Sequence, residues 1–173
     1  MLSASDHMYK DGMKAAAACS LGDLELRESR ADTALIQYRK AWQTIQESPT
    51  MNAHERHGAR ALAGMAAAYA ASGDLERAIS LLRQGEERLK ICRDIRNAAA
   101  GANLAELEYC FAVACVRIGN GEEALRHLHR AVAAGWCDSN WLQEDPELSP
   151  LRSQPQFSSL VEQTRISAQT ICN

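Results

Sequence analysis

The chain has 173 residues, of which 46% are hydrophobic and 24% charged, and its net charge is −3 with a pI of about 6.0. These values are typical of a globular domain or a small helical array and disfavour nucleic acid and anionic membranes as partners. No apolar run reaches the roughly 18 residues of a membrane span, and charges interrupt the Ala-rich start, so we expect neither an export signal nor a span, and a cytoplasmic location.

Residues 1–14 are predicted to extend the first helix, and three similar segments follow at 15–45, 59–89 and 105–135. Each segment contains an apolar helical pattern, a short break and a second, amphipathic helical pattern. Gly and Pro are sparse, and no Pro precedes Pro49, which favours long helices over a β fold.

The breaks carry helix stop and start signals. Gly73 and Gly119 stand where the first helix of a pair ends, and Ser29 takes that position in the first segment. A residue after a helix end often has positive φ, which glycine adopts most readily. Asp74 and Asn120 follow as predicted N-caps.

Small and large side chains recur at matching positions in the three segments. Small residues let two helix axes approach closely, and larger ones fill the spaces between them. The small sets are Gly22, Ala66 and Ala112; Ala34, Ala78 and Ala124; and Ala41, Gly85 and Ala131. The large sets are Leu21, Met65 and Phe111, and Tyr38, Leu82 and Leu128.

Over residues 15–136 this pattern resembles the tetratricopeptide repeat. The resemblance implies an all-α solenoid of three helix pairs. The segments start 44 and 46 residues apart, at residues 15, 59 and 105, rather than the family's roughly 34. The additional residues are helix formers, so we expect longer helices, with turns at Pro49 and between Asp94 and Gly101.

The C-terminal stretch resembles the end-of-group form that closes many bacterial arrays of this kind, and implies a helical cap over 137–173. Asp145 and Pro146 are predicted to start one helix and Pro155 the last. In the last helix, Leu160, Val161 and Ile166 are predicted to face inward. Trp136, Trp141 and Phe157 are expected to cover the last repeat, a ligand site made of the two Trp being the alternative.

We find no motif for catalysis, a metal or a cofactor. His54 and His57 are three residues apart and lack the spacing of a zinc helix. The six cysteines form no C-x-x-C pair and are interpreted as reduced. The alternative from another class is a cysteine enzyme that uses Cys115 or Cys137.

The family resemblance implies that the first helices of the repeats line a concave groove for a peptide or an amphipathic helix. The alternative is that its alanines only pack helix to helix. The groove also lacks the Lys/Asn clamp of chaperone-binding relatives. The predicted groove residues are Asp23, Leu26, Arg27, Arg60, Ala63, Ala67, Ala70, Tyr109, Val113, Val116 and Arg117.

We therefore expect a non-catalytic scaffold or adaptor that binds a protein partner. A secretion-type chaperone is the alternative among binding proteins. Self-association into a homo-oligomer stays open.

Overall fold

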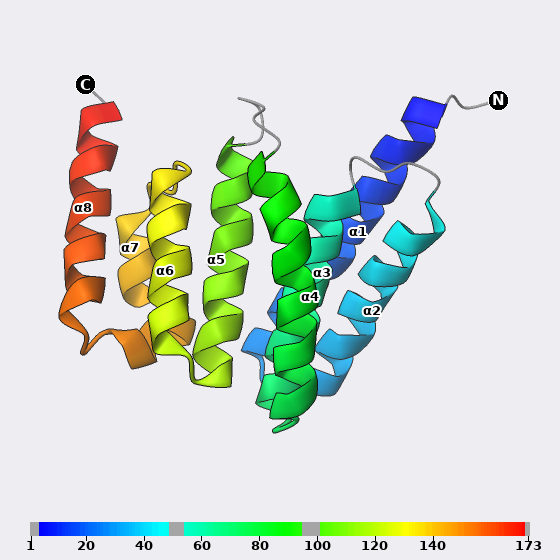
Figure 1. Ribbon diagram of the computed structural model, residues 1–173, viewed down its shortest axis with the longest axis horizontal. Helices are drawn as coiled ribbons and strands as arrows, with labels where there is room; N and C mark the ends of the chain where they lie inside the picture. The colour runs from blue at the N-terminus through cyan, green and yellow to red at the C-terminus, as the bar shows by residue number, and fades with distance from the viewer. Residues whose placement is uncertain (1–3, 49–53, 95–100, 172–173) are drawn as a thin grey trace. The chain divides into compact units, whose positions relative to one another are not determined.

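The computed structural model describes residues 4–48, 54–94 and 101–171, without the side chains at the outer ends of these ranges. Every regular element in this part of the chain is a helix (Figure 1), which confirms the predicted all-α class. The chain divides into two compact units, Met1–Ile95 and Arg96–Asn173. No helix in the described ranges is long and apolar enough to cross a membrane.

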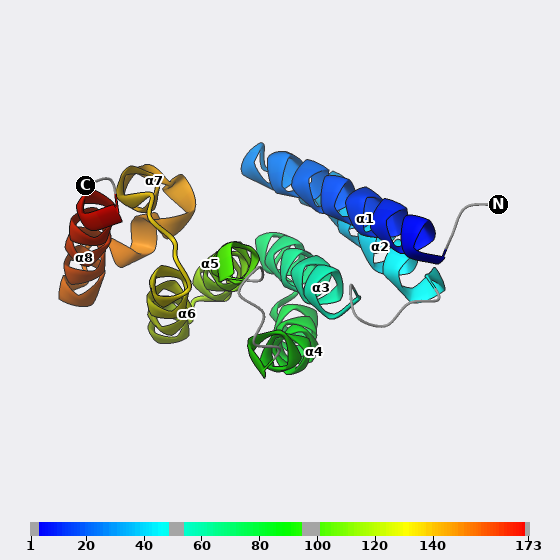
Figure 2. The ribbon, with the colours of Figure 1, turned by 90° about the horizontal axis from the view of Figure 1, so that it is seen from above.

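The first unit contains two helix pairs. They are α1 (Ala4–Arg27) with α2 (Ala31–Glu47), and α3 (His54–Ala71) with α4 (Leu75–Asp94). α2 packs on both α1 and α3, and α1 also contacts α3, as the view from above shows (Figure 2). The four helices therefore share one core.

The second unit contains a third pair and a compact C-terminal segment. The pair is α5 (Gly101–Ile118) with α6 (Gly121–Ala133). The segment comprises α7 (Ser139–Glu144), the 3-10 helix η2 (Pro146–Leu151) and α8 (Pro155–Ile171). η2 packs on α5, and α8 packs on α6 and α7.

The turn within each helix pair has the same backbone geometry. Ser29, Gly73 and Gly119 have φ of 61°, 83° and 88°. Each donates its amide to the carbonyl three residues earlier, and the next residue donates to the carbonyl five residues earlier. Asp74 and Asn120 then accept backbone amide hydrogen bonds from the following helix. The predicted stops and caps are confirmed.

The small residues of the first pair make room for one aromatic ring. Tyr38 of α2 is 1% exposed and lies between Gly22 of α1 and Gly64 of α3. A Cβ at Gly22 would lie 2.6 Å from the ring, and one at Gly64 would lie closer still. Gly64 was not among the aligned small residues; its counterparts in the other segments are Ser20 and Cys110.

The predicted helix starts of the C-terminal cap are confirmed. Asp145 accepts a 3.0 Å hydrogen bond from the amide of Glu147, with Pro146 at the first position of η2. Pro155 begins α8, and Phe157 is 3% exposed.

One inward-facing prediction for α8 is wrong. Leu160 is fully buried and Val161 is partly exposed, but Ile166 is 53% exposed. The buried face of α8 continues from Leu160 to Thr164, four residues on. Ile166 lies two residues further, which turns it to the opposite side of the helix.

The predicted turn between α4 and α5 agrees with the ends of these helices, at Asp94 and Gly101. The predicted turn at Pro49, the side chain of His54 and the last cysteine, Cys172, lie outside the described residues.

Candidate protein-binding surfaces

In the first unit, two predicted groove residues from different helices form an ion pair. Arg60 of α3 donates to Asp23 of α1 at 2.9 Å, and the Tyr38 hydroxyl donates to the same carboxylate at 2.7 Å. Arg60 also lies 3.4 Å from the Ser20 hydroxyl. The Arg60 side chain is 16% exposed and that of Asp23 38%. This network fixes α1 against α3 and leaves part of the carboxylate at the surface.

The apolar middle of the predicted groove is closed in this unit. Leu26, Ala63 and Ala67 are 5%, 1% and 3% exposed, so they offer almost no surface to a ligand. Ala70 is half-buried and Arg27 is exposed. This burial agrees with the alternative that the alanines only pack one helix against another.

In the second unit, the predicted groove residue Tyr109 is the centre of an aromatic cluster. Its ring stacks on Trp136, with centroids 4.6 Å apart and planes 10° from parallel. Its hydroxyl accepts a 3.0 Å hydrogen bond from the indole of Trp141. Tyr109 is 7% exposed, whereas Trp141 is 37% exposed and Trp136 half-buried.

A second contact joins the same face of α5 to η2. Arg117 of α5 pairs with Glu147 at 2.5 Å, and both side chains are largely buried. Val113 and Val116 of α5 are half-buried. The C-terminal segment thus lies on the face of α5 that was predicted to line a groove.

The three aromatic residues that were predicted to cover the last repeat, Trp136, Trp141 and Phe157, differ in their burial. Phe157 belongs to the core of the unit, as predicted. Trp136 and Trp141 contact the last helix pair as predicted, through Tyr109 of α5, but Trp136 stays half-buried and Trp141 exposed. A partly exposed cluster of Trp and Tyr is typical of binding surfaces. We name Tyr109, Val113, Trp136 and Trp141 the aromatic platform.

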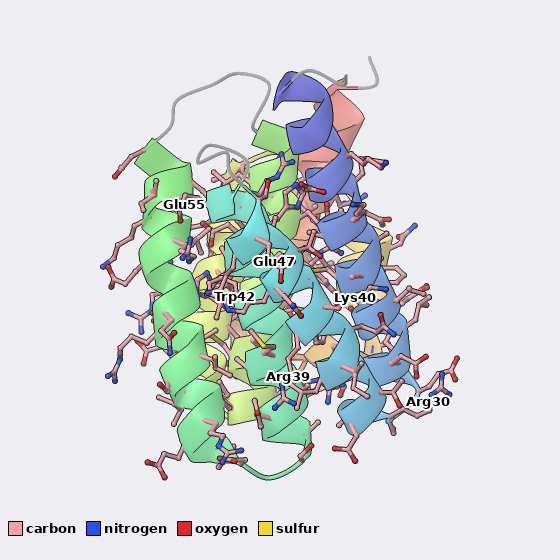
Figure 3. All side chains as sticks on the ribbon, turned by 90° about the vertical axis from the view of Figure 1, so that its right-hand side faces the viewer. Arg30, Arg39, Lys40, Trp42, Glu47 and Glu55 are labelled. Atoms are coloured by element: carbon pink, nitrogen blue, oxygen red, sulfur yellow. The ribbon has the colours of Figure 1, made fainter. Side chains whose placement is uncertain are left out.

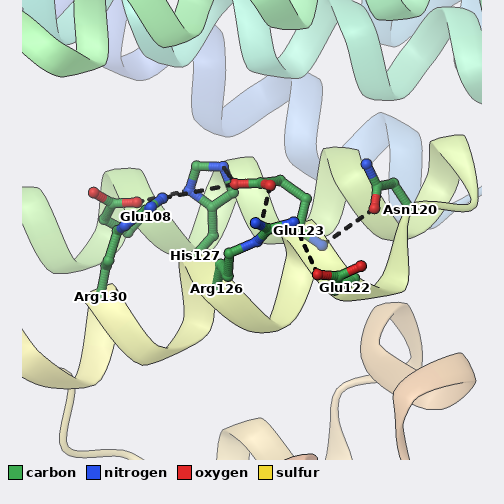
Figure 4. Close-up of polar contacts among 7 residues, drawn as sticks. All are labelled: Glu108, Asn120, Glu122, Glu123, Arg126, His127 and Arg130. Atoms are coloured by element: carbon green, nitrogen blue, oxygen red, sulfur yellow. Dashed lines mark hydrogen bonds and ion pairs between the residues drawn. The ribbon is translucent and has the colours of Figure 1, made fainter.

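The second unit also contains a buried polar pair that the sequence did not reveal. Glu108 of α5 and Nδ1 of His127 of α6 lie 2.7 Å apart, and both side chains are 1% exposed. Glu123 lies 3.8 Å from Nε2 of the same imidazole and binds Arg126 at 3.0 Å (Figure 4). This network connects α5 to α6 through charged groups. The sequence signal was limited to Glu106 and Glu108 within a mostly apolar helix.

Outer faces of the first unit carry cation–aromatic contacts. Arg88 lies 4.9 Å from the Trp42 ring and binds Glu55 at 2.9 Å; Trp42 and Glu55 are labelled in Figure 3. Arg39 donates to the Tyr69 hydroxyl at 2.6 Å. These contacts connect α2 with α3 and α4.

The cysteines differ in access. Cys115 is fully buried, so its thiol offers no surface to a substrate. Cys92 is half-buried, and burial raises the pKa of its thiol, which lowers its thiolate fraction at neutral pH. Cys137 is exposed.

Comparison with known proteins returned no matching family model, no matching curated protein and no matching solved structure.

Proposed function

We propose that this chain is a non-catalytic helical-repeat protein of the tetratricopeptide type that binds a segment of a partner protein. The observation that supports this best is the shared design of the three helix pairs. Each pair turns through a left-handed residue at the equivalent position, Ser29, Gly73 or Gly119, with the same two backbone hydrogen bonds. Repetition of one helix-pair unit is typical of proteins that present side chains for binding.

The aromatic platform is the surface that we assign to the partner. Trp141 and Trp136 retain exposed ring surface on a base that is already ordered, because Tyr109 holds both. An ordered aromatic base loses little conformational entropy when it binds, which favours it as the centre of an interface. The closed middle of the first unit offers no comparable apolar surface.

The platform favours a partner segment with an apolar or aromatic anchor. Val113, one turn from Tyr109 on α5, extends the apolar surface, and the Arg117–Glu147 pair lies on the same helix face. That pair is charge-compensated, so we expect recognition to depend more on apolar packing than on net charge.

Affinity purification from the source cell, followed by calorimetry with the recovered partner, tests the proposal. Val113→Asp places a carboxylate on the platform, and we expect it to weaken partner binding by about 100-fold or more. Ile166→Asp is the matched control, since Ile166 is 53% exposed in the same unit on α8. Equal binding by the two variants would contradict the platform as the binding surface.

A further inference from the structure

One face of α1 carries a continuous apolar stripe that lies exposed. Met13, Leu21 and Leu24 are 57%, 50% and 57% exposed, and Ala17 is exposed between them. The prediction that Leu21 fills a space between two helices is therefore wrong. Spacings of three and four residues place these four side chains on one side of the helix. Single exposed apolar residues are ordinary on a protein surface, but a continuous stripe marks a contact surface.

The equivalent face of α3 is buried. Counted 44 residues along the chain, the offset between the first two segments, Ala17, Leu21 and Leu24 correspond to Ala61, Met65 and Ala68. These α3 residues are 0%, 5% and 1% exposed. α3 packs against α1, α2 and α4, whereas the main contacts of α1 are with α2 and α3. The exposed stripe on α1 therefore corresponds to a face that neighbouring helices cover on α3.

Charged side chains lie at both ends of the stripe. Lys10 and Lys14 lie at its N-terminal end, and Glu28 follows its C-terminal end next to Arg27, all exposed. The alternating spacing of four and three residues that is typical of a coiled-coil seam connects Lys10, Lys14, Ala17, Leu21, Leu24 and Glu28. A parallel pairing of two such helices would place like charges together at each end. An antiparallel pairing places Lys10 opposite Glu28.

We propose that two copies of this chain associate through α1, with the two helices antiparallel about a two-fold axis. In the register that aligns Lys10 with Glu28 of the partner subunit, Ala17 faces Leu21 of the partner subunit. The small side chain lets the helix axes approach, and the leucine fills the space beside it. A two-fold arrangement uses the same surface on both copies, so every contact forms twice.

The charges can rearrange at low cost. Lys14 pairs with Asp11 at 3.1 Å, and Glu28 pairs with Arg30, all within one chain. Exposed ion pairs of this kind contribute little to stability. Exchanging them for ion pairs between two copies therefore costs little free energy. The surface is one helix wide, so we expect a weak, concentration-dependent dimer rather than an obligate one.

Sedimentation equilibrium of the full chain tests this proposal. Between about 10 and 500 µM we expect the apparent mass of the wild-type chain to rise from the monomer value of 19.0 kDa toward twice that value. Leu21→Asp should weaken association by about 100-fold or more, because each dimer would bury two carboxylates, each facing Ala17 of the partner subunit. Ile36→Asp is the matched control: Ile36 is 61% exposed on α2 of the same unit and lies off the stripe.

A charge exchange tests the antiparallel register. Lys10→Glu and Glu28→Lys should each weaken the dimer about tenfold, because each creates two like-charge contacts per dimer. The double variant restores opposite charges and should regain most of the affinity. Circular dichroism shows whether each variant remains folded.

A wild-type chain that stays monomeric over the whole concentration range would overturn the proposal, even if another protein were to bind α1. Equal dimerisation of Leu21→Asp and wild type would also overturn it. A double charge variant as weak as the single ones would reject the antiparallel arrangement. None of these results bears on partner binding at the aromatic platform, which lies in the other unit.

Discussion

At the scale of single residues, the helix pairs depend on positions where a side chain is absent or a backbone angle is unusual. Gly22 and Gly64 leave the space that Tyr38 occupies, and the Tyr38 hydroxyl then reaches Asp23. The ring therefore connects three helices, since it comes from α2 and lies between α1 and α3. One added methyl group at either glycine would displace it.

Gly22→Ala should lower the free energy of unfolding by about 1–3 kcal/mol, because the new Cβ overlaps the buried Tyr38 ring by more than side-chain adjustment can relieve. Urea denaturation measures the change. Gly12→Ala, on the same helix, is the control: its Cβ would meet only the His57 side chain, at 3.2 Å, and alanine favours a helix. Equal loss in both variants would show that the Tyr38 contact is not the cause.

The left-handed turn residues allow a reciprocal test. Ser29 has φ of 61°, which strains a residue with a Cβ, so Ser29→Gly should raise the free energy of unfolding by about 0.5–1 kcal/mol. Gly73→Ser should lower it by a similar amount, since no atom lies within 4 Å of the new Cβ and only the backbone angle matters. Midpoints of urea unfolding that move in the same direction would refute this account.

At the scale of elements, caps and covering contacts decide how the C-terminal segment is placed. Asp138 caps α7 through the amide of Trp141 at 2.8 Å, and Asp145 caps η2. Arg152 donates to the carbonyl of Asp145 at 3.1 Å, which links the end of η2 to its beginning. These local bonds fix the segment whose Trp141 and Glu147 contact α5.

Asp145→Ala should therefore destabilise the second unit by about 1–2 kcal/mol, because it removes the side-chain acceptor at the start of η2. Asp145→Asn retains an oxygen acceptor and should cost less. Thermal unfolding followed by tryptophan fluorescence reports on the change, since Trp136 and Trp141 lie in this unit. An alanine variant as stable as the asparagine variant would argue against the cap.

For the molecule as a whole, the chain divides into two compact units. The third helix pair is in the same unit as the C-terminal segment. Each unit has its own large buried side chains, such as Leu62 in the first and Leu128 in the second. The two proposed contact surfaces, the stripe on α1 and the aromatic platform, lie in different units.

Leu128→Ala should destabilise the second unit by about 2–5 kcal/mol, because it leaves a cavity at a fully buried position. Hydrogen exchange should accelerate most in α5 to α8 and least in α1 to α3. Leu62→Ala should produce the converse pattern. If each variant accelerated exchange equally in both units, the two units would be a single cooperative structure.

The helical class, the turns within the helix pairs and the starts of η2 and α8, but not α7, were predicted from the sequence. These follow from local signals: apolar periodicity, glycine after a helix, and Asp before proline. Such signals act over a few residues and therefore appear in the sequence. The inward-facing prediction for Ile166 was wrong because the buried face of α8 depends on the helices beside it.

Which surfaces stay open became visible only from the packing of the helices. It buries Leu26, Ala63 and Ala67, brings Trp136, Trp141 and Glu147 onto the predicted groove face of α5, and leaves the stripe on α1 exposed. It also joins Glu108 to His127, nineteen residues apart. The exposure of a side chain depends on which helix packs against its face. Apolar periodicity shows which face of a helix is apolar, but it does not show which other helix packs there.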